Sequence, residues 1–161
     1  MTYEQDNTRW PTTDLDPVRR LHALAAGVRG AQVSERLIEA PFDQVWPILA
    51  DLEGELGRVL PDMRGVRITH RNGEQVTAVA HSKYGFRARL AGVQRPGWCW
   101  LQSRFLLVGV AAVAEGPDTR VALTGGVRVP GRAALVPVGV GLSGRRSLDR
   151  LGSLFSPPSA L

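Results

Sequence analysis

Four turn-forming dipeptides divide the middle of the chain into short segments in which hydrophobic and polar residues alternate. They are Asn72-Gly73, Tyr84-Gly85, Pro96-Gly97 and Gly116-Pro117. Glycine and asparagine accept the backbone conformations that tight hairpins require, and period-two alternation is the pattern of a half-buried strand. Residues 66–129 are therefore predicted to form about six antiparallel strands joined by hairpins.

Helical patterns flank this block of strands on its N-terminal side. Asp16 suits an N-cap and Pro17 the first helical position, and apolar residues then recur at helical spacing. A strand is predicted for residues 31–39, and an amphipathic helix for residues 42–52. A second, short helix is predicted for residues 53–60.

The closing helix is predicted for residues 132–155. Its second half carries a stripe of leucines that includes Leu148, Leu151 and Leu154. Its first half contains Pro137 and three glycines, all of which disfavour a helix. This first half is therefore either a loop or a kinked helix.

The order of these elements is typical of an α+β domain, because strands form one block and helices lie at its ends. A curved antiparallel sheet of about seven strands around a long C-terminal helix is expected, with an extra N-terminal helix. The 161 residues suit one domain. We expect a disordered lead (1–13), a helical extension (14–30), the main domain (31–155) and a frayed tail (156–161).

Composition excludes several classes of site. Hydrophobic residues make up 43% of the chain, which is enough for a packed core. Cys99 is the only cysteine, so a disulfide within the chain is impossible and a cysteine-based metal site is not expected. Zinc, phosphate-loop and serine-nucleophile motifs are absent from the sequence, and neither a metal nor a cofactor is expected.

Charge and apolar runs bear on partners and location. The formal charge is +5, and arginine supplies every basic residue except Lys83. The arginines are spread along the chain without long runs, so a nucleic-acid partner is not expected. The longest apolar run, residues 105–114, is too short for a membrane span, and no secretory signal is recognised. We expect a cytoplasmic protein, and the arginine bias suggests a GC-rich, actinobacterial source; the sequence gives no oligomeric state.

Turn positions fix hairpin register, and register decides which side chains share a face of the sheet. A two-residue turn at Asn72-Gly73 places His81 on the same apolar face as Val66, and the next turns continue this register. That face is expected to point inward, and its many small residues favour a cavity for a ligand. The predicted ligand-binding residues are Trp46, Thr77, Val79, His81, Phe86, Ala88, Leu90, Ser103, Phe105 and Leu123.

His81 is the candidate for chemistry, because a buried imidazole needs a hydrogen-bond partner and can exchange a proton. It is either a core residue whose hydrogen bonds are satisfied or a pocket residue that orients or deprotonates a ligand. Trp98 and Trp100 are predicted on the outer face beside arginines. There they would either stack nucleic-acid bases or take part in cation–π packing, and we favour the second interpretation.

Residues 33–51, VSERLIEAPFDQVWPILAD, resemble the opening of the polyketide cyclase/dehydrase-like proteins of the START-like (SRPBCC) superfamily. In those proteins a strand ends in Ala-Pro, and a helix with Val-Trp and a following Asp comes next. The corresponding residues here are Ala40-Pro41, Val45-Trp46 and Asp51. The resemblance implies a helix-grip fold over residues 31–155, with a cavity between the sheet and the C-terminal helix, and it implies scaffold roles for the motif residues.

Members of this superfamily include aromatase/cyclases, lipid and sterol carriers, quinone-binding proteins and hormone receptors. The resemblance therefore implies binding or transport of a hydrophobic small molecule, such as a lipid, a polyketide or a quinone-like compound. The alternative is a cyclase or dehydratase with His81 as acid/base. A further alternative is a protein- or nucleic-acid-interaction domain that uses the basic outer face of the sheet.

Overall fold

The computed structural model describes residues 14–54, 63–82, 85, 87–128, 131, 133–136 and 142–157. In chain order the elements are α1 (Pro17–Ala26), β1 (Val33–Ile38), α2 (Phe42–Ala50), β2 (Met63–Asn72), β3 (Gln75–Ser82), β4 (Arg87–Arg95), β5 (Trp98–Gln102), β6 (Leu106–Glu115), β7 (Asp118–Arg128), β8 (Leu135–Val136) and α4 (Leu142–Ser153). The predicted lead, and most of the short helix predicted at residues 53–60, lie outside the described residues.

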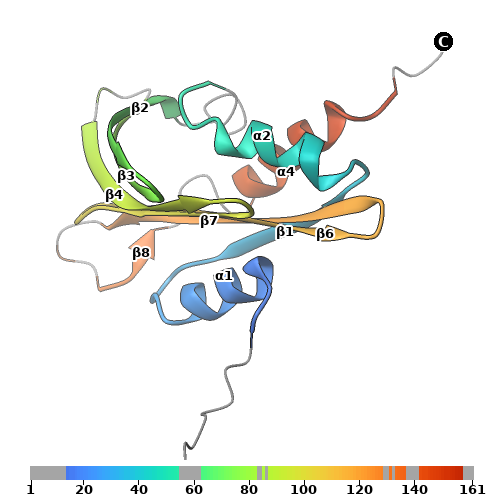
Figure 1. Cartoon of the computed structure of the whole chain (residues 1–161). Coiled ribbons are helices and arrows are strands. Elements are labelled where there is room, and N and C mark those ends of the chain that lie inside the picture. The colour runs from blue at the N-terminus through green and yellow to red at the C-terminus, as the bar shows by residue number, and fades with distance from the viewer. Residues whose placement is uncertain are drawn as a thin grey trace, which may run out of the picture.

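The strands form one antiparallel sheet in the order β1-β7-β6-β5-β4-β3-β2, and β8 pairs with the end of β7. β2, β3 and β4 curl out of the plane of β6 and β7 toward α2 (Figure 1). α2 and α4 lie on the concave side of the sheet, and α1 lies against the opposite side. The predicted α+β, helix-grip architecture with a curved sheet of seven strands is confirmed.

The closing helix is shorter than predicted. α4 begins at Leu142 rather than at residue 132, and β8 occupies part of the segment predicted to be helical. Leu135 and Val136 pair with Arg128 and Val127 on β7. β-branched and apolar residues suit an edge pairing of this kind, whereas the proline and glycines that follow disfavour a helix.

β4 passes very close to β5 at Gly92. A Cβ added at Gly92 would lie only 1.8 Å from the carbonyl oxygen of Trp100. Gly92 pairs with Leu101, and β4 is the strand that joins the curled strands β2 and β3 to β5. Glycine in a strand interior marks such tight bends and close approaches of two backbones. The absence of a side chain at Gly92 therefore allows β4 and β5 to approach this closely.

α1 closes a second, smaller core on the outer side of the sheet. Leu21 is fully buried there with Val18 and Trp98. Gly109 leaves room for it, because a Cβ at Gly109 would lie 3.0 Å from Leu21 Cδ1. The guanidinium of Arg20 lies 5.7 Å from the centre of the Trp98 ring. The predicted outward orientation of Trp98 is correct, and the tryptophan is covered by α1 and is unable to stack nucleic-acid bases.

Candidate functional site

The concave face of β3 and β4 is an apolar wall of small side chains. Val76, Ala78 and Ala80 on β3 lie on this face, and each is at most 3% exposed. Their cross-strand partners on β4 are Gly92, Leu90 and Ala88, in the same order. Residues directly opposite each other in an antiparallel pair share a face. The two strands therefore present mainly alanine and glycine around one large side chain.

Helices and the flatter strands complete this face. Val45 and Leu49 of α2 are fully buried against it, and Leu148 and Leu151 of α4 join the same cluster. Trp46 is partly buried and packs on the edge of the cluster. Strands β6 and β7 contribute further buried residues, which include Val108, Val110, Ala112, Val121 and Leu123.

A short chain of polar contacts marks the end of the concave face nearest α2. Arg71 Nη2 donates to Gln94 Oε1 at 2.6 Å, and Gln94 Nε2 donates to the carbonyl oxygen of Ala50 at 2.7 Å. Cys99 pairs with Gln94 and is fully buried. Burial raises the pKa of the Cys99 thiol to about 12, although the charge of Arg71 acts in the opposite direction. The thiol is thus protonated at neutral pH and is not a nucleophile.

Four of the sequence-predicted ligand-binding residues lie on or beside the concave face. Leu90 is 1% exposed and Leu123 is 2% exposed, and both belong to the concave-face core. Ala88 pairs with Ala80, and Trp46 packs from α2. Their contact with a ligand stays a prediction.

Three predicted residues of β3 lie on the wrong face. Thr77, Val79 and His81 alternate with the buried residues of that strand, so they point away from the concave side and are only half-buried. The reason is the register shift in β2 between Ile68 and His70: Ile68 pairs with Ala78, whereas a regular two-residue turn at Asn72-Gly73 would pair it with Thr77. A shift of one residue moves every side chain of a strand to the other face.

The remaining predicted residues do not join the site. Ser103 ends the pairing of β5, and its hydroxyl oxygen accepts from the backbone N–H groups of Phe105 and Leu106. Phe105 is 50% exposed in the turn between β5 and β6. The predicted inward orientation of Phe105 is therefore wrong, because the chain turns at residues 103–105 instead of continuing β5. Phe86 lies outside the described residues.

Ala78 and Ala80 are not among the predicted ligand-binding residues, although both lie in the wall. The position of the hairpin turn, at Gly73-Glu74, does not explain this, because Val76 still shares a face with Arg71. A register shift within β2, between Ile68 and His70, puts Val66 and Ile68 on the face of Ala78 and Ala80. Such a bulge carries no sequence signal of its own here.

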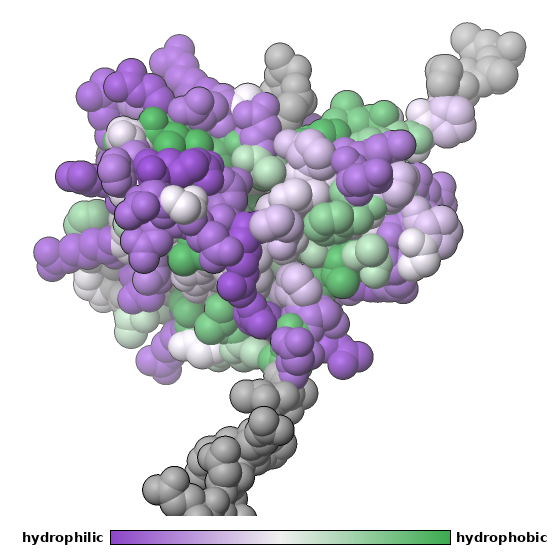
Figure 2. All heavy atoms as spheres, in the orientation of Figure 1, coloured by the Kyte–Doolittle hydropathy of each residue, from purple (hydrophilic) through white to green (hydrophobic). Residues whose placement is uncertain are grey.

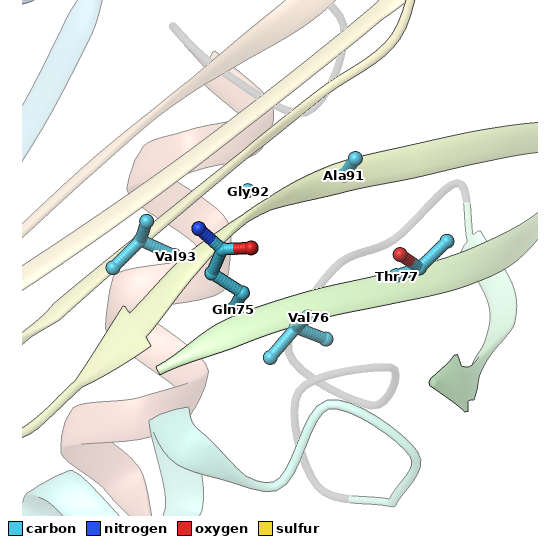
Figure 3. Close-up of a pocket in the computed structure, with 6 residues that line it drawn as sticks. All are labelled: Gln75, Val76, Thr77, Ala91, Gly92 and Val93. Atoms are coloured by element: carbon cyan, nitrogen blue, oxygen red, sulfur yellow. The ribbon is translucent and has the colours of Figure 1, made fainter. Parts of the chain in front are cut away.

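A separate hollow lies on the outer side of the curled strands. It has a volume of about 310 Å³, and its lining comes from Gln75, Val76, Thr77, Ala91, Gly92 and Val93. Thr77 pairs with Ala91, and Gln75 pairs with Val93, on the face opposite the concave core. Figure 3 shows Thr77 and Ala91 on one side of the strands and Val76 on the other. The hollow is shallow and open, and Thr77 is the one predicted ligand-binding residue in it.

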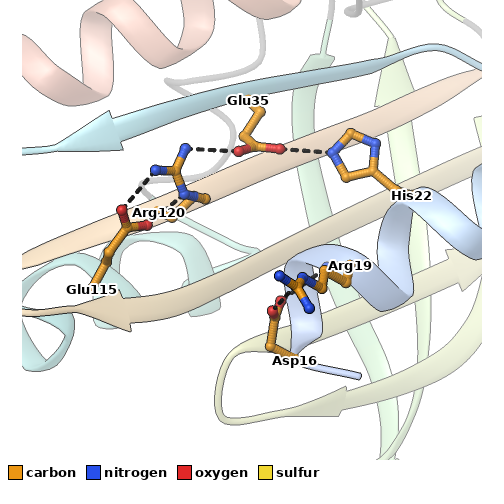
Figure 4. Close-up of polar contacts among 6 residues, drawn as sticks. All are labelled: Asp16, Arg19, His22, Glu35, Glu115 and Arg120. Carbon is orange, nitrogen blue, oxygen red and sulfur yellow. Dashed lines mark hydrogen bonds and ion pairs between the residues drawn. The ribbon is translucent and has the colours of Figure 1, made fainter. Parts of the chain in front are cut away.

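An ion-pair network joins α1 to β1, β6 and β7 on the outer side (Figure 4). Glu35 accepts from His22 Nε2 at 2.7 Å and from Arg120 Nη1 at 2.8 Å. Arg120 also donates to both oxygens of Glu115. Burial on its own raises the pKa of Glu35, but hydrogen bonds and charges from His22 and Arg120 outweigh it, so the pKa is lowered. The arrangement is a set of paired charges without a free acid–base group, so it serves to attach α1.

Replacing Glu35 with glutamine is expected to remove a contribution to stability that depends on pH. A carboxylate whose pKa is lowered by folding stabilises the protein above its unfolded value of 4.5, and this contribution disappears as the pH falls through the folded value. The wild type should exceed Glu35→Gln by less than about 1 kcal/mol at neutral pH, because exposed ion pairs are weak. Urea unfolding at a series of pH values measures the difference.

The control for this experiment is Glu39→Gln, which changes an exposed carboxylate that has no ion pair among the described residues. The gap between wild type and Glu35→Gln should close below pH 4.5, whereas Glu39→Gln should show no such trend. A gap that persists unchanged at acidic pH would contradict the role given to Glu35.

Two further kinds of site are absent from the described part of the chain. Histidine, cysteine, aspartate and glutamate nowhere gather there in groups of three that would hold a metal ion. None of the described helices is both long enough and apolar enough to span a membrane.

Comparison with known proteins connects this geometry to solved structures. A protein of Thermus thermophilus superposes with a TM-score of 0.53 at 21% identity, over 76% of this chain and 94% of that one. The KanY protein gives a TM-score of 0.57 at 13% identity, over 78% of this chain and 97% of that one. The Zhui aromatase/cyclase of Streptomyces sp. R1128 gives 0.51 at 17% identity, over 77% and 84%.

No protein-family model matches the sequence, and no curated protein matches it. The likeness to solved structures therefore concerns the fold. It spans the curved sheet, and it includes an aromatase/cyclase of the kind that the Ala40-Pro41 and Val45-Trp46 motifs resemble. The chain has a START-like, helix-grip fold.

Proposed function

We propose that the protein binds or carries a hydrophobic small molecule, such as a lipid, a polyketide or a quinone-like compound, on the concave face of its sheet. The observation that carries this proposal is the wall of small buried residues, Ala78, Ala80 and Ala112, on a sheet curled beneath α2 and α4. Small side chains on a curved sheet leave volume that a ligand can take over from protein atoms.

The energetics of the wall favour an apolar ligand. The concave-face core consists of aliphatic and aromatic residues together with Cys99, whose thiol is protonated. Burial of apolar surface contributes roughly 25 cal/mol per Å² before the costs of binding are subtracted. Arg71 and Gln94 lie at one end and offer a place for a polar group of the ligand. A cytoplasmic location stays part of this proposal.

Binding is favoured over catalysis by the position of His81. His81 lies on the face opposite the wall, so its imidazole is out of hydrogen-bond reach of a ligand held there and cannot exchange a proton with it. The cyclase or dehydratase alternative would need another acid–base group at the concave face. No observation on the described residues of that face favours one.

Enlarging Ala80 is expected to reduce the amount of bound ligand. Native mass spectrometry of the protein purified from its host should reveal a bound lipophilic molecule. Ala80→Leu should lower the occupancy of that molecule, because the added side-chain atoms take up the space beside the wall. Overpacking of this kind also costs about 1–3 kcal/mol of stability, so thermal unfolding is measured alongside. His81→Ala should leave the occupancy unchanged.

The matched control is Ala91→Leu, which adds the same atoms on the exposed outer face of β4. It should retain full occupancy. Three results would each contradict the proposal: no lipophilic molecule in repeated preparations, equal occupancy in Ala80→Leu and Ala91→Leu, or loss of the ligand in His81→Ala.

A further inference from the structure

The positive charge of the chain is concentrated in one half of the sheet. Residues 63–114, which run from the start of β2 almost to the end of β6, contain eight basic residues and one acidic residue, Glu74. Their formal charge of +7 therefore exceeds the +5 of the whole chain. The arginines are spread along the sequence, but the fold brings this stretch together in the strands β2–β5. The rest of the chain is slightly acidic.

Ion pairs of arginine occur outside residues 63–114, where Arg19 pairs with Asp16, Arg20 with Asp14, Arg36 with Asp149 and Arg120 with two glutamates. The exposed arginines of α4, Arg145, Arg146 and Arg150, form no ion pair among the described residues. In the basic half, none of the exposed arginines of β2 and β4 forms an ion pair within the described residues. Arg71 donates a hydrogen bond to Gln94, and the others are Arg64, Arg67, Arg87 and Arg89. Unpaired charges of one sign produce a positive potential that attracts anionic partners.

Register places three of these arginines on one face. Arg67 on β2 and Arg89 on β4 both pair with Val79, from either side of β3. Arg87 pairs with His81 on the same outer face. Figure 2 shows hydrophilic residues gathered over the side of the molecule where β2–β4 lie. Arg67, Arg87 and Arg89 together form the basic face of the sheet.

An exposed aromatic residue lies in the turn that follows β5, the strand paired with β4. Phe105 is 50% exposed in the turn that follows β5. Gln102, the last residue of β5, pairs with Ala91, so this turn begins beside the N-terminal half of β4, which carries Arg87 and Arg89. Arg104 lies 5.7 Å from the centre of the Phe105 ring. Basic residues that attract an anionic surface and an exposed apolar side chain that inserts into it are the two groups by which proteins bind a membrane from one side.

We propose that the basic face, together with Phe105, docks onto an anionic lipid bilayer. Charge complementarity favours a negatively charged lipid surface, and Phe105 supplies an apolar group that inserts at the level of the headgroups. Single-stranded nucleic acid is the weaker candidate, because it is bound by exposed aromatic platforms, whereas Trp98 lies buried beneath α1. The docking requires no bound ligand, so it stands apart from the proposed function.

The test is flotation of the full chain with vesicles of phosphatidylcholine that contain about 30 mol% phosphatidylglycerol, compared with phosphatidylcholine alone. The protein should bind only the anionic vesicles. The triple variant Arg67→Gln/Arg87→Gln/Arg89→Gln should bind them at least about tenfold more weakly, since each arginine near the surface contributes on the order of one tenfold step or slightly less. Phe105→Ser should weaken binding without removing its dependence on charge.

The matched control removes the same number of charges elsewhere. Arg145→Gln/Arg146→Gln/Arg150→Gln changes three exposed arginines of α4, which packs on β1 and β7. It should bind within about threefold of wild type if the basic face makes the contact. Circular dichroism of both triple variants verifies that the fold is retained.

Three results would each overturn the proposal. The first is equal binding of the two triple variants, and the second is equal binding of charged and uncharged vesicles. The third is tighter binding to a single-stranded oligonucleotide than to anionic vesicles at about 0.1 M salt, where the Debye length is about 10 Å. Loss of vesicle binding leaves the ligand occupancy measured by native mass spectrometry unaffected, so the two proposals fail separately.

Discussion

Gly92→Ala is expected to destabilise the protein by about 3 kcal/mol or more, or to prevent folding, because the added methyl group has no space. Its Cβ would lie 1.8 Å from the carbonyl oxygen of Trp100 and 3.0 Å from the Cα of Leu101. Both neighbours are backbone atoms of a paired strand, so neither can rotate away. The two strands would have to separate at this pair. Urea unfolding measures the loss.

The control is Gly65→Ala on β2, where an added Cβ meets nothing within 4 Å. This variant should stay within about 0.5 kcal/mol of wild type, as most unhindered surface substitutions do. If Gly92→Ala were as stable as Gly65→Ala, β4 and β5 would not approach as described.

Leu21→Ala is expected to cost about 2–5 kcal/mol, which is the range for a leucine removed from a packed core. Leu21 is fully buried between α1 and the outer side of the sheet, against Trp98 and Gly109. Its loss would leave a cavity beneath the helix, and Gly109 has no side chain to fill it. The same variant should also increase the exposure of Trp98, which tryptophan fluorescence detects.

Leu24→Ala is the matched control, because Leu24 lies on the same helix and is 44% exposed. It should cost less than about 1 kcal/mol. Equal effects of the two substitutions would show that α1 is not anchored through Leu21. α1 would then be a dispensable addition to the domain, and not the lid of a second core.

The sequence predicted the sheet well where glycine turns were placed correctly. The Pro96-Gly97 turn fixed the register between β4 and β5, so Cys99 and Leu101 were assigned to the buried face correctly. Gly97 has a φ of +76°, which only glycine adopts readily. At this hairpin, the glycine that the turn requires and the observed strand pairing indicate the same register.

The prediction failed at two places in the register. A bulge in β2 between Ile68 and His70 puts Val66 and Ile68 on the face of Ala80 and Ala78, and β3 pairs with β4 one residue away from the predicted register. His81 pairs with Arg87 and not with Ala88. The two errors cancel at β4, so Leu90 was assigned correctly while His81 was placed on the wrong side. Alternating patterns do not reveal such a slip when both faces carry alanine and valine.

Packing between distant segments was the other part that the sequence did not predict. The polar link from Arg71 through Gln94 to Ala50 joins residues from three elements, and no local pattern signals it. The gathering of unpaired arginines on β2 and β4 likewise depends on the pairing of strands. In both cases the residue types are ordinary, and their significance comes from which segments the fold brings together.

The most direct test of the concave wall is an NMR measurement of contacts between methyl groups and a ligand. Protein labelled at alanine methyls, and carrying the lipophilic molecule from its host, should show intermolecular NOEs to Ala78 and Ala80 and none to Ala91. NOEs to Ala91 without any to Ala78 or Ala80 would place the ligand on the opposite side of the sheet. That result would contradict the proposal that this fold encloses its ligand beneath α2 and α4.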